Sequence, residues 1–240
     1  MRLAAFCLTL ICAAPAFAGV KEARFSEPTT RYAHGILGDA IEFGTLEIVT
    51  DAGKAITMRL PETRVFEDIE PRLVDVDLDG DNEVVVIESS TTQGACLAIY
   101  NETGLVAATP YIGRSNRWLA PLGAADLDGD GAIELAYIDR PHLAKTLRIW
   151  RFEGGQLTHI ADRSGLTNHR IGEDFISGGV ITCGGTAQIV SADANWSRVM
   201  ISELKNGKIT SRDAGPFSKA NLRERAPADI FAIKSIWPIN

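Results

Sequence analysis

The sequence predicts an all-β fold: a small β-propeller with four clear four-stranded repeats and a partial fifth blade that both termini would build. Two observations favour this fold class. An acidic loop occurs twice, at residues 75–83 (the first acid loop) and 126–134 (the second acid loop), and the two copies begin 51 residues apart. Each copy is followed by a β-type apolar run. Because propeller blades repeat at roughly 40–50 residues, this interval is typical of the architecture.

Four units of strand-like segments follow one another along the chain, separated by turn signals. The expected strands of the second unit are 73–75, 84–88, 95–100 and 105–111, and those of the third are 122–125, 135–138, 146–152 and 157–160. The fourth unit has the same order at 175–182, 188–191, 198–204 and 208–211, and the first at 32–37, 45–50, 55–60 and 64–67. Residues 183–186 replace the acidic loop in the fourth unit, and the first unit has Asp39 and Glu42 near that position, so we expect no metal in either.

The chain ends lie outside these units, at residues 20–30 and 215–240. A strand is expected over 229–237 and a helical turn over 219–225. Because a closed ring leaves no exposed sheet edge, we expect the two ends to share the fifth blade. The pattern leaves the blade number open between four and five.

Both acid loops have the side-chain pattern of a Ca²⁺ site, with acids at positions 1, 3, 5 and 9 and a Gly at position 6. Ca²⁺ takes six to eight oxygen ligands at about 2.3–2.6 Å, and Gly permits the sharp turn. The expected side-chain ligands are Asp75, Asp77, Asp79 and Glu83 in the first loop and Asp126, Asp128, Asp130 and Glu134 in the second. The backbone carbonyls of Asp81 and Ala132, at position 7, and water would complete the shells. About two bound Ca²⁺ ions, mainly structural, are therefore expected.

Acidic loops of this kind have two other interpretations, an EF-hand and a solvated turn. An EF-hand needs a Glu at position 12, where this chain has Val86 and Tyr137, so that reading fails. A solvated acidic turn stays open as the alternative, since Asp and Gly are common turn residues. Two copies in phase favour the metal site.

The two acid loops and the strands around them resemble the FG-GAP and VCBS-type repeat family. The resemblance covers residues 71–140 well and 31–212 weakly. The Phe-Gly and Gly-Ala-Pro elements of that family do not precede either acid loop. The resemblance implies a calcium-binding β-propeller in an exported bacterial protein, and it leaves the activity open because these repeats occur in proteins of many functions.

The N-terminus is typical of a cleaved export signal. Residues 1–18 contain a positive start, a short apolar stretch and an Ala-Phe-Ala cleavage site before Gly19. The expected organisation is thus a signal peptide at 1–18 and a single propeller domain at 19–240, periplasmic or secreted and monomeric. The apolar stretch is too short to span a membrane, so no transmembrane segment is expected.

Composition and cysteine content add further bounds. The net charge is −7 and the chain has no Lys/Arg run, so a nucleic-acid partner is not expected. The mature chain keeps Cys96 and Cys183. A single disulfide and two buried thiols both remain open for this pair.

A candidate ligand surface is expected on the propeller face opposite the acid loops. The second strand of each unit ends in an acid: Asp51, Glu88, Asp139 and Asp193. Nearby loops add Arg, Trp and His side chains, which makes the expected ligand-binding residues Arg117, Trp118, Asp139, Arg140, His142, His169, Arg170, Asp193 and Trp196. Arg grips carboxylates and Trp stacks on sugars, so a glycan or a protein ligand would fit. The open alternative is that each acid caps its own turn and pairs with a neighbouring Arg.

Three function classes follow from this surface. The favoured one is a binding or interaction module, with no catalytic residue assigned. A polysaccharide lyase or hydrolase would use His142 with Asp139, or His169 with Asp174, as acid/base pairs. A purely structural envelope scaffold is the third class.

Overall fold

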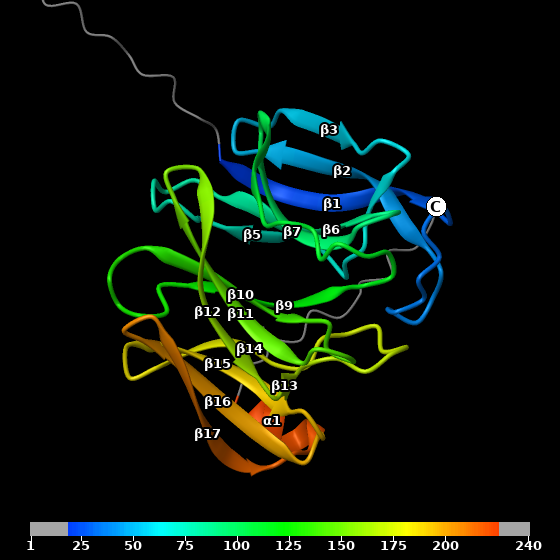
Figure 1. The fold of residues 1–240 in the computed structure, drawn as a ribbon. Coiled ribbons are helices and arrows are strands. Elements are labelled where there is room, and N and C mark those ends of the chain that lie inside the picture. Colours follow the sequence, from blue (N-terminus) through cyan, green and yellow to red (C-terminus); the bar gives the residue numbers. More distant parts are fainter. Residues whose placement is uncertain (1–18, 226–240) are drawn as a thin grey trace, which may run out of the picture.

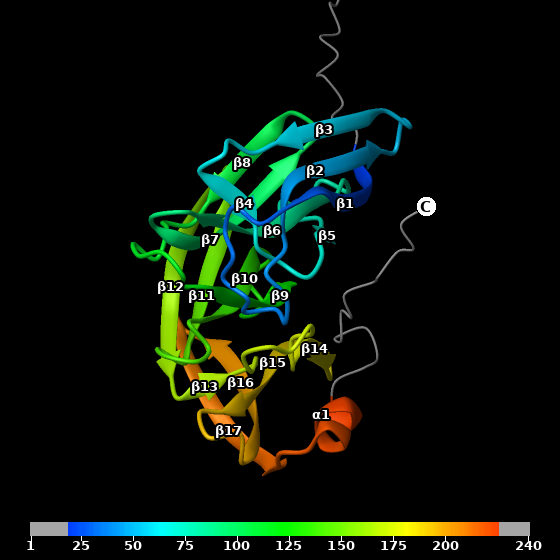
Figure 2. The same cartoon turned by 90° about the vertical axis from the view of Figure 1, so that its right-hand side faces the viewer.

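The computed structural model describes residues 19–225, which form antiparallel sheets and a short helix near the C-terminal end. The units follow one another along an arc, from β1–β3 at one end to β17 at the other (Figure 1, Figure 2). The first unit contains β1 (Val20–Thr29), β2 (Glu42–Thr50) and β3 (Ala55–Arg59). The second contains β4 (Arg64–Phe66), β5 (Arg72–Val74), β6 (Glu83–Ser90), β7 (Gly94–Asn101) and β8 (Gly104–Ala108).

The third and fourth units complete the arc. The third contains β9 (Leu119–Ala125), β10 (Ile133–Asp139), β11 (Thr146–Glu153) and β12 (Gln156–Ser164). The fourth contains β13 (Leu166–Thr167), β14 (Gly179–Cys183), β15 (Thr186–Asp193), β16 (Arg198–Lys205) and β17 (Lys208–Pro216). The predicted all-β, propeller-type fold is confirmed, and the strands of the second, third and fourth units lie where the repeat pattern puts them.

The inner strand is divided in two of the units. β4 and β5 both pair with β6, and β13 and β14 both pair with β15. In the third unit β9 stays continuous, with a register shift between Ala136 and Tyr137 on β10. The division releases residues 67–71 and 168–178 from the sheets, and these two segments carry several of the buried polar side chains described below.

One predicted strand of the first unit was wrong, and the predicted fourth strand is present but pairs differently from the expectation. Residues 32–37 form a loop rather than its first strand, and that strand is β1, which pairs with β2 so that Phe25 faces Leu46. The apolar residues Tyr32, Ile36 and Leu37 are buried as parts of this loop and not as one face of a strand. The predicted fourth strand, β4, pairs mainly with β6 and therefore joins the first two units into one sheet.

The core consists of apolar clusters between neighbouring units. One cluster between the second and third units includes Ile87, Leu97, Trp118 and Leu135. The predicted helical turn is confirmed as α1 (Lys219–Arg225), whose Leu222 packs in the cluster of the fourth unit. No helix of residues 19–225 is long and apolar enough to cross a membrane.

The loop between β1 and β2 reaches across to the fourth unit. The N–H of Gly172 donates to the carbonyl of Ile36 over 3.1 Å. Gly38 has a φ of +96°, and a Cβ there would lie 3.0 Å from the carbonyl oxygen of Gly172. The first and fourth units therefore meet through loops. The N-terminal segment expected in the fifth blade instead forms β1, which pairs with β2 of the first unit. The predicted strand 229–237 lies outside the described residues, so a contribution of the C-terminal segment to a fifth blade stays a prediction.

Candidate functional site

The first acid loop connects β5 to β6 and gathers three carboxylates. Oxygen atoms of Asp75, Asp77 and Glu83 all lie within 4.8 Å of one another. Backbone N–H groups orient two of them, because Gly80 donates to Asp75 Oδ2 over 3.1 Å and Val76 donates to Glu83 Oε2 over 3.0 Å. Within residues 19–225, no Arg, Lys or His forms an ion pair with this loop.

The electrostatics of the first acid loop favour a bound cation. Burial and the neighbouring charges of Asp77, Asp79 and Asp75 raise the pKa of Glu83 to about 7. Asp75 Oδ1 is buried and has no hydrogen-bond partner. A buried, unpaired carboxylate oxygen is costly, and a hard divalent cation is the partner that such oxygens prefer. Asp75, Asp77 and Glu83 therefore fit a Ca²⁺ ion.

The second acid loop connects β9 to β10 and repeats the cluster with Asp126, Asp128 and Glu134 within 4.8 Å of one another. Asp128 Oδ1 is again buried without a partner. The loop differs from the first in one respect: Arg151, on β11, lies against it. The guanidinium contacts Asp128 Oδ2 at 2.8 Å, Asp130 Oδ2 at 2.7 Å and Glu134 Oε1 at 2.7 Å.

The predicted ligands at positions 5 and 7 lie outside the two clusters. Asp79 Oδ1 accepts a hydrogen bond from the N–H of Asp81 over 2.9 Å. Asp130 Oδ1 likewise accepts from the N–H of Ala132 over 3.0 Å. Both acids thus stabilise the turn, and their role as metal ligands, like that of the position 7 carbonyls, stays a prediction.

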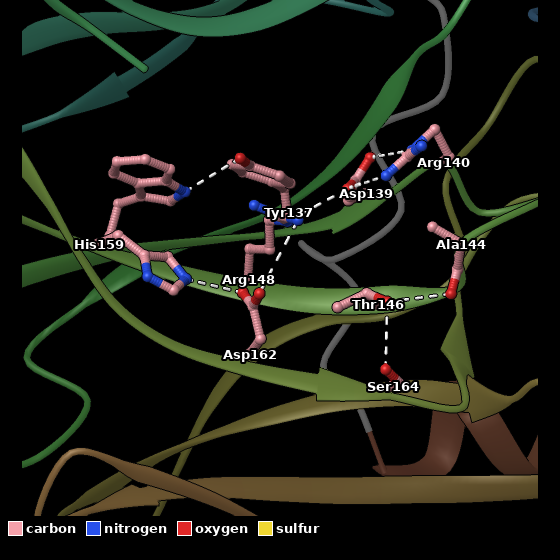
Figure 3. A network of polar contacts seen from close by, with 10 residues as sticks. Tyr137, Asp139, Arg140, Ala144, Thr146, Arg148, His159, Asp162 and Ser164 are labelled. Atoms are coloured by element: carbon pink, nitrogen blue, oxygen red, sulfur yellow. Dashed lines mark hydrogen bonds and ion pairs between the residues drawn. The ribbon is translucent and has the colours of Figure 1, made fainter. Parts of the chain in front are cut away.

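The acids at the ends of the second strands are mostly engaged within the protein. Glu88 contacts Arg64 Nη1 at 2.9 Å and accepts a hydrogen bond from the Tyr100 hydroxyl. Asp139 is 3% exposed, so little of its side chain is accessible to a ligand. It receives two hydrogen bonds from Arg140, at 2.8 and 2.9 Å, and lies 3.1 Å from Arg148 Nε (Figure 3).

Asp193 has a similar structural role at the end of β15. Its carboxylate accepts hydrogen bonds from the N–H of Ser197 over 2.6 Å and of Arg198 over 2.8 Å. Burial opposes ionisation, but these hydrogen bonds prevail and lower the pKa of Asp193. Asp51, in contrast, is exposed in the turn after β2. The interpretation in which strand-end acids cap turns and pair with Arg thus accounts for Glu88, Asp139 and Asp193.

Besides Asp139, two of the expected ligand-binding residues are buried, Trp118 and His169. Trp118 is 2% exposed, and its indole N–H donates to the carbonyl of Glu67 over 2.8 Å. His169 is 0% exposed, and its ring contacts both Trp118 and His142. Neither ring presents a surface on which a ligand can stack. The acid/base pairs expected of an enzyme do not form either. Asp139 pairs with Arg140 and Arg148. Both ring nitrogens of His169 are engaged away from Asp174, by His142 and by the Glu173 carbonyl.

The His pair has a defined hydrogen-bond direction. His169 Nε2 lies 2.8 Å from the carbonyl of Glu173, which can only accept, so this nitrogen carries the proton. His169 Nδ1 then accepts from His142 Nε2 over 3.3 Å. Burial lowers the pKa of His169 to about 4 and also lowers the pKa of His142. Both rings are therefore neutral near pH 7.

The exposed part of the predicted ligand surface lies on the loops after β10, β13 and β15. The guanidinium carbon of Arg170 lies 4.1 Å from the ring centroid of Trp196, and Phe217 packs edge-on against the same Trp. Leu143 and Ile171 are 63% and 69% exposed. Arg117 lies on the connection before β9, where its Nη1 donates to the carbonyl of Asn116 over 2.6 Å.

An apolar cleft of about 280 Å³ lies between the inner strands β5, β9 and β14. Its lining includes Val74, Pro121, Leu122, Ile176 and Val180. Glu70 and Arg72 border it at the second unit. The cleft follows the inner side of the arc, where a propeller has its axis.

Sequence reasoning missed three features of these sites. Arg151 follows the second acid loop by a whole strand, and only the pairing of β10 with β11 brings it to Glu134. The exposed Leu143 and Ile171 are apolar residues in polar loops, which is the signal that could have identified them.

A comparison with known protein families supports the repeat predicted from the two acid loops. Residues 75–137 match the sequence model of the FG-GAP-like repeat, so both acid loops and the strands between them have the pattern of this family. No curated protein matches the chain.

Proposed function

We propose that this chain, which carries an FG-GAP-like repeat at residues 75–137, is an exported β-propeller that Ca²⁺ stabilises and that binds a protein partner through its loop face. The loop face is defined here as Leu143, Arg170, Ile171, Trp196 and Phe217. The observation that carries the proposal is the exposure of Leu143 and Ile171 on loops opposite the acid loops. FG-GAP repeats belong to β-propeller-like interaction modules, which agrees with a binding role.

Calcium would have a structural role in this protein. Asp75, Asp77 and Glu83 would hold the ion in the first acid loop, with Asp126, Asp128 and Glu134 as the corresponding set in the second. The bound ion supplies the positive charge that these carboxylates need. Because each loop joins an inner strand to the next strand of its unit, neutralising it would stabilise the start of β6 or β10.

The loops that carry the exposed apolar residues are tied together. Thr167 Oγ1 donates to the carbonyl of Pro141 over 2.8 Å, and His142 donates to His169. Leu143 and Ile171 therefore lie on loops that hydrogen bonds hold in place. A rigid apolar surface favours binding because little conformational entropy is lost on association.

The chemistry of the loop face fits a protein ligand with apolar side chains and a carboxylate. Arg170 is 45% exposed at its side chain, stacks on Trp196 and lies 3.8 Å from Glu173 Oε1. This single long contact leaves other N–H groups of the guanidinium to bind a ligand carboxylate. A glycan ligand is less favoured, because Trp118 is buried and Arg170 covers one face of the Trp196 ring.

The proposal is tested with affinity capture and a glycan panel. The double variant Leu143→Asp/Ile171→Asp should lose a protein captured from cell-envelope extract by the parent chain, because the apolar contact becomes charged. The control Leu105→Asp changes a residue that is 51% exposed on β8 and should retain the partner. Capture that is unchanged in the double variant, or saturable glycan binding abolished by Trp196→Ala, would contradict a protein-binding loop face.

Export has its own test. Expressed with residues 1–18, the chain should reach the periplasm or medium with Gly19 as its first residue, because cleavage would follow Ala18. N-terminal sequencing of the purified protein measures this. A cytoplasmic protein that retains its first 18 residues would contradict export.

A further inference from the structure

The two acid loops differ in their balance of charge. The first contains five carboxylates and the second contains four. The second loop also has the guanidinium of Arg151 within 2.8 Å of three of its acids, Asp128, Asp130 and Glu134. Among the described residues, no Arg, Lys or His side chain pairs with the acids of the first loop. The first loop therefore has more uncompensated negative charge than the second, which favours a metal ion at the first.

Arg151 is held in place by its strand as well as by the acids. Residue 151 pairs with Glu134 across β10 and β11, so its side chain starts beside the last ligand of the loop. The Nε, Nη1 and Nη2 groups each contact a different carboxylate. Such charge-assisted hydrogen bonds are roughly twice as strong as neutral ones, and the side chain is 20% exposed.

The corresponding position beside the first loop is polar and uncharged. Val84 pairs with Tyr100, which places Asn101 opposite Glu83 in the same register. Asn101 Oδ1 accepts a hydrogen bond from the N–H of Thr103 over 2.9 Å, within its own turn. The first loop thus has five acids and no basic side chain beside them, whereas the second has four acids and Arg151.

We propose that Arg151 is the internal counter-cation of the second acid loop, so that the first loop is the tight Ca²⁺ site. The second loop takes Ca²⁺ only when the guanidinium leaves its carboxylates. Ligand charge sets the Ca²⁺ affinity of such loops, and a guanidinium that occupies Asp128, Asp130 and Glu134 both removes ligand charge and repels the ion. This inference rests on the proposed calcium role and replaces two equal ions by one tight site.

Calorimetric titration of chelator-treated chain, residues 19–240, with CaCl₂ tests the inference. The parent chain should bind one ion tightly, Asp77→Asn should lose it, and Asp128→Asn should keep it. Arg151→Gln should add a second tight site, with an affinity gain of at least about tenfold at the second loop. Arg148→Gln, on the same strand but in contact with Asp139 and Asp162, is the control and should leave the ion number unchanged.

A reciprocal variant and a melting experiment complete the design. Asn101→Arg should weaken the tight site, because it places a guanidinium beside Glu83. In chelator, Arg151→Gln should melt below the parent chain, and Ca²⁺ should restore the difference. Two equal ions in the parent chain with no effect of Arg151→Gln would overturn the inference and leave the calcium role intact. Folded parent and Arg151→Gln chains that bind no Ca²⁺ would overturn both.

Discussion

The indole N–H of Trp118 donates to the backbone carbonyl of Glu67 over 2.8 Å and thereby joins the third unit to the second. Glu67 belongs to the segment that the division between β4 and β5 releases from the sheet. Its side chain is 0% exposed, contacts His34 at 2.5 Å and accepts a hydrogen bond from Ser89. A polar layer therefore stands beside the apolar core where the units meet.

Trp118→Phe should lower the free energy of unfolding by about 1–3 kcal/mol, because the Glu67 carbonyl loses a buried donor and the smaller ring leaves space. Urea unfolding measures the change. Trp196→Phe is the matched control at a partly exposed Trp and should change stability by only about 0.5 kcal/mol. Equal effects of the two variants would show that the Trp118 hydrogen bond does not join the units.

Stability should fall as the pH drops from about 6.5 to about 4, in part because of His169. The folded-state pKa of His169 is lowered to about 4, so in this range the unfolded chain binds a proton that the folded chain does not. The full contribution is present above about pH 6.5 and reaches about 3 kcal/mol.

His169→Gln keeps a donor toward the Glu173 carbonyl but cannot titrate, so its unfolding free energy should depend less on pH between 4 and 6.5. His159→Gln, on β12 and more exposed, is the control and should keep the parent slope. Burial raises the pKa of Glu67, so its contribution to stability is lost as the pH rises, which is opposite to the contribution of His169. This contribution is the same in the parent chain and in both His variants. A slope that is unchanged in His169→Gln would contradict a neutral His169.

Asp139→Ala should lower the free energy of unfolding by about 1–3 kcal/mol, because Arg140 and Arg148 lose their common carboxylate. Asp162→Ala is the control on β12, which lies beyond β11 in the same sheet (Figure 3). Asp162 is 39% exposed at its side chain, and it lies 3.8 Å from Arg148 and 2.7 Å from the similarly exposed His159, so about 0.5 kcal/mol is expected there. Thermal melts of both variants would show whether burial decides the difference.

Gly94→Ala should destabilise the protein much more than Gly53→Ala. The two glycines have nearly the same φ, 74° and 75°. A Cβ at Gly94 would lie 2.2 Å from the carbonyl oxygen of Arg114, whereas a Cβ at Gly53 meets nothing within 4 Å. The pair therefore separates contact from backbone strain, and the difference should be about 1–3 kcal/mol in chemical unfolding. Equal losses would mean that strain alone matters.

Removing calcium should lower the melting temperature of the parent chain. An ion present at 100 times its Kd stabilises the folded state by about 2.7 kcal/mol. Asp77→Ala in calcium should melt close to the parent chain in chelator, because Asp77 is one of the clustered oxygens of the first acid loop. Melting curves of Asp77→Ala that still rise as strongly with Ca²⁺ would place the ion elsewhere.

The fold class and most strands could be predicted from local patterns. The repeated acids, the apolar runs after them and the turn signals are all short-range features, and β6, β10 and β15 lie where those features put them. The first unit was the exception. Tyr32, Ile36 and Leu37 are buried by a loop between units, and this burial cannot be distinguished from a strand face by composition alone.

The sequence by itself determined the two acid loops, since all of their clustered carboxylates lie within nine residues of one another. Only the tertiary structure decided which of these loops has its own cation. A repeat offset of 51 residues would align Arg151 with Tyr100, whereas strand pairing places it opposite Glu134 and aligns it with Asn101. The tertiary structure likewise buried Trp118 and His169 and left Leu143 and Ile171 exposed. The physical reason is that local spacing fixes what one loop can gather, while the charges and surfaces that meet it come from strands and loops distant in the sequence.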